Sequence, residues 1–134
     1  MAILNWSYVE PLKRIDAVER FAKSVGTELP AQVARWLAKN NAGIPDPATF
    51  DTQENEGYEV KGLLSYNKGD EENIYTLYPL LAQEGFYPLA LEGSGDVIAL
   101  DIERQIYVLI SHETDEVSPI DTASCPGLFP ELSE

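Results

Sequence analysis

Residues 93–113 read GSGDVIALDIERQIYVLISHE, and this stretch predicts a β-hairpin at the centre of a sheet. Its apolar residues alternate in two runs, Ile98, Leu100 and Ile102, then Ile106, Val108 and Ile110. A period of two places each run on one face of a strand. Directly opposed residues of an antiparallel pair share a face, so matching the two runs leaves residues 103–105 as the loop. The same register sets Asp96 opposite His112.

The hairpin also carries the only histidine of the chain, which makes it the first place to look for a reactive centre. His112-Glu113 begins like the helical motif of zinc proteases, but that motif needs a second histidine four residues on, where this chain has Glu116. Gly93 and Gly95 open a predicted strand, whereas phosphate-binding glycine loops open a helix. We therefore predict no catalytic, metal-binding or cofactor-binding residue, and a histidine that contacts a neighbouring carboxylate.

One interpretation still gives this histidine a chemical role. His112 could act with Asp96, or it could activate Cys125 as a nucleophile. Cys125 is the only cysteine of the chain, and no signature of a catalytic cysteine surrounds it in its Pro-Gly loop. An enzyme that uses these residues is one of three functional interpretations of the sequence, and the other two are given at the end of this subsection.

Two helices are predicted ahead of the sheet. The first spans residues 11–25, since Pro11 suits a first helical position and apolar residues recur there at helical spacing. The second begins at Pro30 and ends at Asn40-Asn41-Ala42-Gly43, because Asn and Gly adopt the left-handed conformation at low cost. The apolar residues of the two predicted stripes are Leu12, Ile15, Val18, Phe21, Ala22, Val25, Val33, Trp36 and Leu37.

The segment between the second helix and the hairpin is mixed. Residues 44–57 contain two prolines and several acids, which predicts a loop, and residues 58–66 predict a strand. A turn follows, in which Asp70 can cap a short helix. Pro79 should break or kink that helix near Tyr78.

Proline also marks the strand next to the hairpin and the end of the chain. Residues 86–91 predict a strand in which Pro88 indicates an edge position or a bulge. After Pro119 we expect a short segment with three apolar residues, Leu128, Phe129 and Leu132.

Negative charge is concentrated behind residue 45. The chain carries 23 Asp and Glu against nine Lys and Arg, a net charge of −14 at pH 7. Residues 1–45 hold six basic and four acidic residues, a net +2, so residues 46–134, with three basic and nineteen acidic, carry −16. Such a field repels nucleic acid and anionic membranes and speeds association with basic partners. We predict no nucleic-acid or membrane partner.

Length and composition indicate one domain over residues 1–134. No run approaches the ~20 apolar residues of a membrane helix. The N-terminal apolar patch has no basic residue before it and does not read as a secretory signal. One cysteine cannot form an internal disulfide, and we therefore expect a cytoplasmic protein.

Two acidic clusters in predicted loops are candidates for a protein interface, because an exposed aromatic can anchor a partner while carboxylates steer it. The alternative is that the aromatics are core residues. The first cluster, with Phe50 and Tyr58, comprises Asp46, Asp51, Glu54, Glu56 and Glu59. The second, with Tyr75, comprises Asp70, Glu71 and Glu72, and a rim is formed by Glu113, Asp115 and Glu116.

The order of several short motifs is familiar. Leu29-Pro30 opens a helix that closes as NNAGIP at residues 40–45, and VKGLLSY at 60–66 leads through an acidic turn to Ile74-Tyr75. Pro88-Leu89-Ala90 is followed by Gly95-Asp96, Leu100-Asp101, Ile106-Tyr107-Val108 and His112-Glu113. Over about residues 27–125 this order resembles the SUKH superfamily, the Smi/Knr-like proteins. Two departures are Ala42, where the family often has Gly, and a closing helix that only Ser124 and Phe129 echo.

The resemblance implies an α+β fold with a central antiparallel sheet flanked by helices. It also implies a bacterial immunity protein, which binds and neutralises a cognate toxin, often a nuclease, without catalytic residues of its own. We therefore predict a non-enzymatic protein that binds a basic toxin through the acidic loops and rim. The alternative is a small cytoplasmic scaffold or regulatory protein whose partner is not a toxin.

Overall fold

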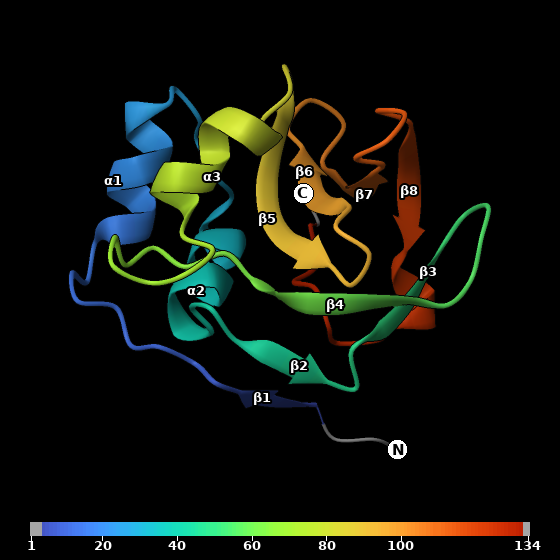
Figure 1. Ribbon diagram of the computed structural model, residues 1–134, viewed down its shortest axis with the longest axis horizontal. Coiled ribbons are helices and arrows are strands. Elements are labelled where there is room, and N and C mark those ends of the chain that lie inside the picture. The colour runs from blue at the N-terminus through green and yellow to red at the C-terminus, as the bar shows by residue number, and fades with distance from the viewer. Residues whose placement is uncertain (1–3, 133–134) are drawn as a thin grey trace.

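The computed structural model describes residues 4–132 as a mixed α+β fold in which helices lie beside a small barrel (Figure 1). The helices of the described part are α1 (Ala17–Ser24), α2 (Ala31–Lys39) and α3 (Ile74–Leu81). Strands β1 (Asn5–Ser7) and β2 (Ile44–Asp46) form a separate ribbon. None of the helices in this part of the chain is long and apolar enough to cross a membrane.

Six antiparallel strands close the barrel in the order in which they occur in the sequence. They are β3 (Thr49–Thr52), β4 (Tyr58–Leu63), β5 (Phe86–Glu92), β6 (Val97–Asp101), β7 (Ile106–Ile110) and β8 (Val117–Asp121). The last strand returns to the first through the pairs Asp51↔Asp121 and Thr52↔Ile120. The barrel is thus more specific than the predicted sheet flanked by helices. Because each strand pairs with its neighbour in sequence, successive connections alternate between the two barrel ends.

The predicted hairpin exists as β6 and β7, but its register is shifted by one residue. Ile98 pairs with Leu109 and Asp101 with Ile106, so four residues, 102–105, form the loop. The reason lies in the loop itself, where the Asp101 carboxylate accepts hydrogen bonds from the Arg104 backbone N–H (3.0 Å) and from its guanidinium Nε (2.7 Å). A side chain that organises the turn in this way fixes the register independently of the apolar pattern.

Both faces of the hairpin are buried, which explains why the two apolar runs do not share a face. Ile98 and Leu100 point into the barrel with Leu109 and Tyr107. The outer face is covered by Leu81, Phe86 and other partly buried apolar residues, and its own buried members are Val97, Ala99, Val108 and Ile110. With apolar residues on both sides, matching apolar runs cannot distinguish registers that differ by one residue.

The first helix is shorter than predicted, whereas the second agrees with the prediction. Residues 11–16 are not helical, because the Lys13 backbone N–H donates to the Asn67 side chain (2.9 Å) and so ties this segment to a distant turn. Ile15, predicted to be in the apolar stripe, is 91% exposed, while Val18 is fully buried. In α2, Val33 is buried as expected.

The short third helix differs from the prediction at both ends. Its N-cap is Asn73, whose side-chain oxygen accepts from the Thr76 N–H (2.9 Å), and not Asp70. Pro79 lies inside the helix, which continues for two residues beyond it, and therefore does not break it. The Asp70 carboxylate instead accepts from Ser65 Oγ (2.7 Å) and so stabilises the preceding turn.

Two strands lie in a segment that was predicted to be a loop, and a third lies where no element was predicted. β2 and β3 occupy the predicted loop at 44–57, and β8 follows the hairpin with Pro119 in its middle. The bulge predicted at Pro88 is confirmed by a register shift between Pro88 and Ala90 in the pairing of β5 with β6. A bulge of this kind bends a strand and suits the wall of a narrow barrel.

The barrel interior and the layer beneath the helices form one continuous core. The hydroxyl oxygens of Tyr66 and Tyr87 lie 2.6 Å apart within it. The C-terminal segment also packs there, since Leu128 and Phe129 are buried and the Phe129 ring stacks on Tyr107 with centroids 4.7 Å apart. Residues 125–132 form no helix after the 3₁₀ turn Thr122–Ser124.

Candidate functional site

Three connections meet at one end of the barrel, namely residues 53–57, 93–96 and 111–116. The Gln53 N–H donates to Pro119 O (2.9 Å), the Gly93 N–H to Glu59 O (2.8 Å), and the His112 N–H to the Asp96 carboxylate (3.1 Å). We call this surface, made of residues 51–59, 92–97 and 110–118, the acidic end. Its carboxylates are Asp51, Glu54, Glu56, Glu59, Glu92, Asp96, Glu113, Asp115 and Glu116. None of these three segments contains Lys or Arg.

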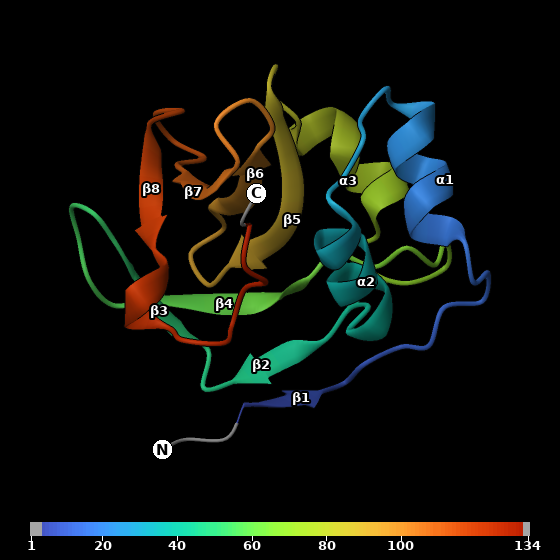
Figure 2. The same ribbon diagram turned by 180° about the vertical axis from the view of Figure 1, so that it is seen from behind.

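The β3–β4 loop at 53–57 is ordered by its own hydrogen bonds. The Asp51 carboxylate accepts from the Gly57 N–H (3.0 Å), and Thr52 Oγ1 accepts from the Asn55 N–H (3.0 Å). Glu54 accepts from Ser118 Oγ of β8 (3.2 Å) and remains exposed. The loop projects beyond the barrel wall in both views (Figures 1 and 2), so its exposed acids face solvent.

The β7–β8 loop at 111–116 is organised around one serine. Ser111 Oγ accepts from the N–H groups of Glu113 (3.2 Å) and Thr114 (3.3 Å), and the Ser111 N–H donates to Glu116 O (2.9 Å). Asp115 adopts a left-handed backbone conformation with φ 63°. The three acidic side chains of this predicted rim are exposed. They lie beside the β3–β4 loop because β8, which follows them, pairs with β3.

Two further acids of this surface, Glu92 and Asp96, flank the turn between β5 and β6. Glu92 is 5% exposed and accepts from both the N–H (3.0 Å) and the hydroxyl (2.5 Å) of Ser94. Asp96 Oδ1 lies 2.5 Å from His112 Nδ1. This hydrogen bond is the main reason that the pKa of His112 is raised, and the charges of Asp96, Glu113 and Glu92 add to it. The predicted contact of His112 with a carboxylate is thus present.

Several predicted interface residues lie elsewhere or cannot make the predicted contact. Phe50 is 1% exposed and stacks on the half-buried Tyr58, with centroids 5.6 Å apart, so the prediction of an exposed Phe50 anchor is wrong. Asp46 is exposed but belongs to the β1–β2 ribbon, paired with Asn5. The Phe50 ring belongs to the core and Tyr58 packs against it, so neither ring is exposed as an anchor.

The second predicted cluster is separate from the acidic end. It lies on the connection between β4 and α3, where the Glu72 carboxylate pairs with Lys61 (2.5 Å) and Asp70 is half-buried in its own turn. Glu71 is exposed, and Tyr75 is half-buried with its hydroxyl donating to Tyr66 O (2.9 Å). The structure therefore does not join this cluster to the first.

Of the residues considered for catalysis, His112 contacts Asp96, but Cys125 and His112 are not brought together. Cys125 follows β8 whereas His112 precedes it, so the length of a strand separates them. Burial raises the pKa of the Cys125 thiol, and nearby Asp121 and Asp51 raise it further, which keeps the thiolate scarce at neutral pH. Within residues 4–132 no three His, Cys, Asp or Glu side chains group as metal ligands.

Comparison of the chain with protein-family models, with curated proteins and with solved structures finds no match to any of them. The candidate site therefore has to be argued from its own geometry. The acidic end was partly predicted, but the contributions of Glu92 and Asp96 to it were not. The signal that could have found them is topological, because alternate connections of a sequential antiparallel sheet lie at the same end.

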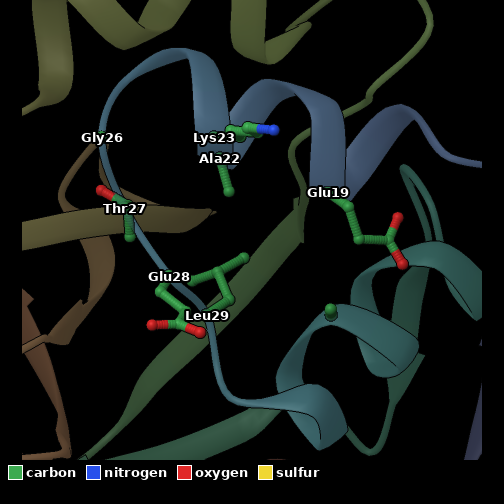
Figure 3. Close-up of a pocket in the computed structure, with 8 residues that line it drawn as sticks. Glu19, Ala22, Lys23, Gly26, Thr27, Glu28 and Leu29 are labelled. Atoms are coloured by element: carbon green, nitrogen blue, oxygen red, sulfur yellow. The ribbon is translucent and has the colours of Figure 1, made fainter.

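A hollow lies between α1 and α2 (Figure 3). It encloses about 410 Å³, with Ala22 and Leu29 on its floor and the carboxylates of Glu19 and Glu28 on opposite sides. Their charges do not converge on one point, and we assign no ligand to this hollow.

Proposed function

We propose that the protein is a non-enzymatic binding module of the cytoplasm whose acidic end binds a basic protein partner. The observation that carries the proposal is the composition of that surface, which holds nine carboxylates and no Lys or Arg in its three segments. Carboxylates gathered without cations repel one another, so the surface costs some folding free energy that a basic partner would recover.

The hydrogen-bonded backbones of these loops support a role in binding a partner, beyond the solubility that exposed acids provide. Hydrogen bonds to Asp51, Thr52 and Ser111 fix the backbones that carry the exposed acids. Binding by fixed loops loses less conformational entropy than binding by flexible ones. A merely solvated acidic surface does not require such preorganisation.

The resemblance to the SUKH superfamily extends the proposal to a bacterial immunity protein. A nuclease toxin must hold phosphates and therefore carries a basic active face. An acidic inhibitor of matching shape can cover that face and associate fast, at up to about 10⁸ M⁻¹s⁻¹ in low salt. The alternative is a scaffold or regulatory protein with another basic partner, and the identity of the captured protein distinguishes the two.

A pull-down from the native cell, with mass spectrometry of what is captured, tests the proposal. The wild type is compared with a variant of the acidic end that combines Glu54→Lys, Glu56→Lys and Glu113→Lys. Asp51 is left intact because its carboxylate holds the loop. The matched control reverses three exposed acids outside this surface, Glu84, Glu103 and Glu131.

We expect the wild type and the control to capture the same basic protein and the acidic-end variant to lose it. The association rate of the purified pair should fall steeply as salt rises, because exposed charges are screened over about 10 Å at 0.1 M ionic strength. Retention of the partner by the acidic-end variant, or association that is independent of salt, would contradict the proposal.

A further inference from the structure

A group of four cations lies at the opposite end of the molecule from the acidic loops. A hollow of about 610 Å³ is lined by Arg14, Arg20, Lys23 and Lys68, and no carboxylate is among its lining residues. Four of the nine Lys and Arg thus line one hollow in a chain of net charge −14. Both views place α1, which carries Arg20 and Lys23, and the β3–β4 loop at opposite ends of the longest axis (Figures 1 and 2).

Two segments far apart in sequence, residues 14–24 and 68–75, are fixed together to make this hollow. Asn67 joins the turn at 67–70 to the segment before α1, because its Oδ1 accepts from the Lys13 N–H (2.9 Å) and its Nδ2 donates to Pro11 O (3.0 Å). Lys68, the next residue, lies over the Tyr75 ring with its Nζ 5.3 Å from the centroid. The backbone segments that carry these cations are therefore held together by the hydrogen bonds of Asn67.

Most of these cations are not neutralised by the protein. Arg14 pairs with Asp16 through Nε (2.8 Å), but in the described part of the chain Arg20, Lys23 and Lys68 have no carboxylate within ion-pair distance. These three cations are unpaired even though the chain contains 23 Asp and Glu. Unpaired cations that share a hollow repel one another, and an anion of two charges relieves this repulsion better than a single charge does.

We propose that this hollow binds a phosphate dianion, either as the free ion or as the phosphate group of a small molecule. Guanidinium forks and ammonium groups are the side chains that bind phosphate oxygens. Ala17, Phe21 and Tyr75 supply an apolar wall for the organic part of such a molecule. The volume falls within the roughly 300–1,000 Å³ of small-molecule sites. The acidic end of a second copy fits less well, because two chains of −14 repel each other.

This site is independent of the proposed partner surface, and its test needs no partner. The amide resonances of the ¹⁵N-labelled protein are followed by NMR during titration with inorganic phosphate, adenosine 5′-monophosphate, adenosine, and acetate at matched ionic strength. The variant Arg20→Gln/Lys68→Gln is compared with Arg35→Gln/Lys39→Gln, which removes two exposed cations of α2 that do not line the hollow.

We expect phosphate or the monophosphate to shift the amides of residues 67–70 and of α1, while adenosine and acetate do not. Binding of phosphate alone assigns the free ion, and binding of the monophosphate assigns an organic phosphate. The hollow variant should bind at least about tenfold more weakly, because it lacks two of the charged donors to the anion, and the control should bind like the wild type.

Three results would overturn the assignment. They are the absence of saturable shifts with either phosphate probe, equal shifts with acetate, and equal weakening in the control variant. Sedimentation without ligand supplies a fourth, because self-association lost only in the hollow variant would assign the hollow to a second copy of the chain.

Discussion

His112 Nδ1 lies 2.5 Å from Asp96 Oδ1, and the same oxygen accepts from the His112 backbone N–H (3.1 Å). A carboxylate can only accept, so Nδ1 carries the proton in this contact. The pair joins the β5–β6 turn to the β7–β8 loop and is the only place on the acidic end, among the described residues, where a side chain can carry positive charge. Protonation of His112 therefore affects both its contact with Asp96 and the net charge of the acidic end.

The first prediction concerns the titration of this histidine. Because the hydrogen bond to Asp96 raises the pKa of His112 above its usual value of about 6.5, the contact stabilises the fold fully below that value. The stabilisation is lost as pH rises through the raised pKa of the folded state. Asp96→Asn should lower the pKa of His112 in an NMR titration, whereas Glu103→Gln at the other barrel end should not. An unchanged pKa in Asp96→Asn would refute the assigned cause.

The second prediction concerns the buried tyrosine pair. Tyr66→Phe leaves the Tyr87 hydroxyl without its partner 2.6 Å away, so the free energy of unfolding should fall by about 1–2 kcal/mol in urea titrations. Replacing both residues by Phe removes both hydroxyls, and the loss should be smaller than the sum of the two single losses. Additive losses would mean that the two hydroxyls do not stabilise each other.

The third prediction concerns the end of α2. Ala42 has φ 64°, a left-handed conformation that a residue with a Cβ adopts at some cost, so Ala42→Gly should raise the free energy of unfolding by about 0.5–1 kcal/mol. Gly43→Ala is the opposite case, because its Cβ would lie 2.8 Å from Asn40 O and 3.0 Å from the Trp6 ring. It should destabilise the protein. The same sign of effect in both variants would contradict this explanation.

The fourth prediction concerns the β6–β7 loop. Burial raises the pKa of Asp101, but hydrogen bonds from the Arg104 N–H and guanidinium outweigh it, and the pKa is lowered overall. The carboxylate therefore stabilises the fold above the usual Asp pKa of about 3.9, and this contribution is lost as pH falls through the lowered value. Asp101→Asn should be less stable than the wild type at pH 7, and the difference should shrink in urea titrations at pH 2–3. A difference independent of pH would contradict it.

The fifth prediction concerns repulsion within the acidic end. Replacing Glu54, Glu56 and Glu113 together by Gln should raise the free energy of unfolding by about 0.3 kcal/mol per residue at 10 mM salt. The reason is that the repulsion between neighbouring negative charges is removed. The gain should disappear in 0.5 M salt, where these charges are screened. Thermal unfolding at the two salt concentrations measures it. A gain of equal size in both would point to a cause other than charge.

The sequence predicted those parts of the fold in which one local pattern decides the structure. The second helix and the bulge at Pro88 follow from spacing and from the missing N–H of proline. The hairpin was predicted, but its register was not, because apolar residues cover both of its faces and the loop carboxylate of Asp101 decides the pairing. The strands β2, β3 and β8 contain proline or acids, and they become strands only by pairing, β2 with β1 and the other two with their barrel neighbours.

The candidate site was predicted in composition but not in arrangement. Glu54, Glu56 and the rim acids were recognised as charged loop residues, and no local signal placed them side by side. Phe50 looked like an exposed anchor because acids surround it in sequence, yet strand pairing turns its ring inward. The basic hollow was not foreseen, since Lys68 reaches α1 only through the hydrogen bonds of Asn67.

Closure of the barrel has a consequence for how the chain acquires its structure during synthesis. The contacts that close the barrel join residues far apart in sequence, and the hydrogen bond from the Asp51 N–H to Ser124 Oγ spans 73 residues. One edge of β3 therefore has no strand to pair with until β8 has left the ribosome. Until then β4 to β7 form an open sheet with two apolar faces and an unpaired margin at β7. Topologies with such distant contacts fold slowly, and the glutamates and aspartate that follow β7 place negative charge next to this margin, where charges oppose aggregation of exposed strands.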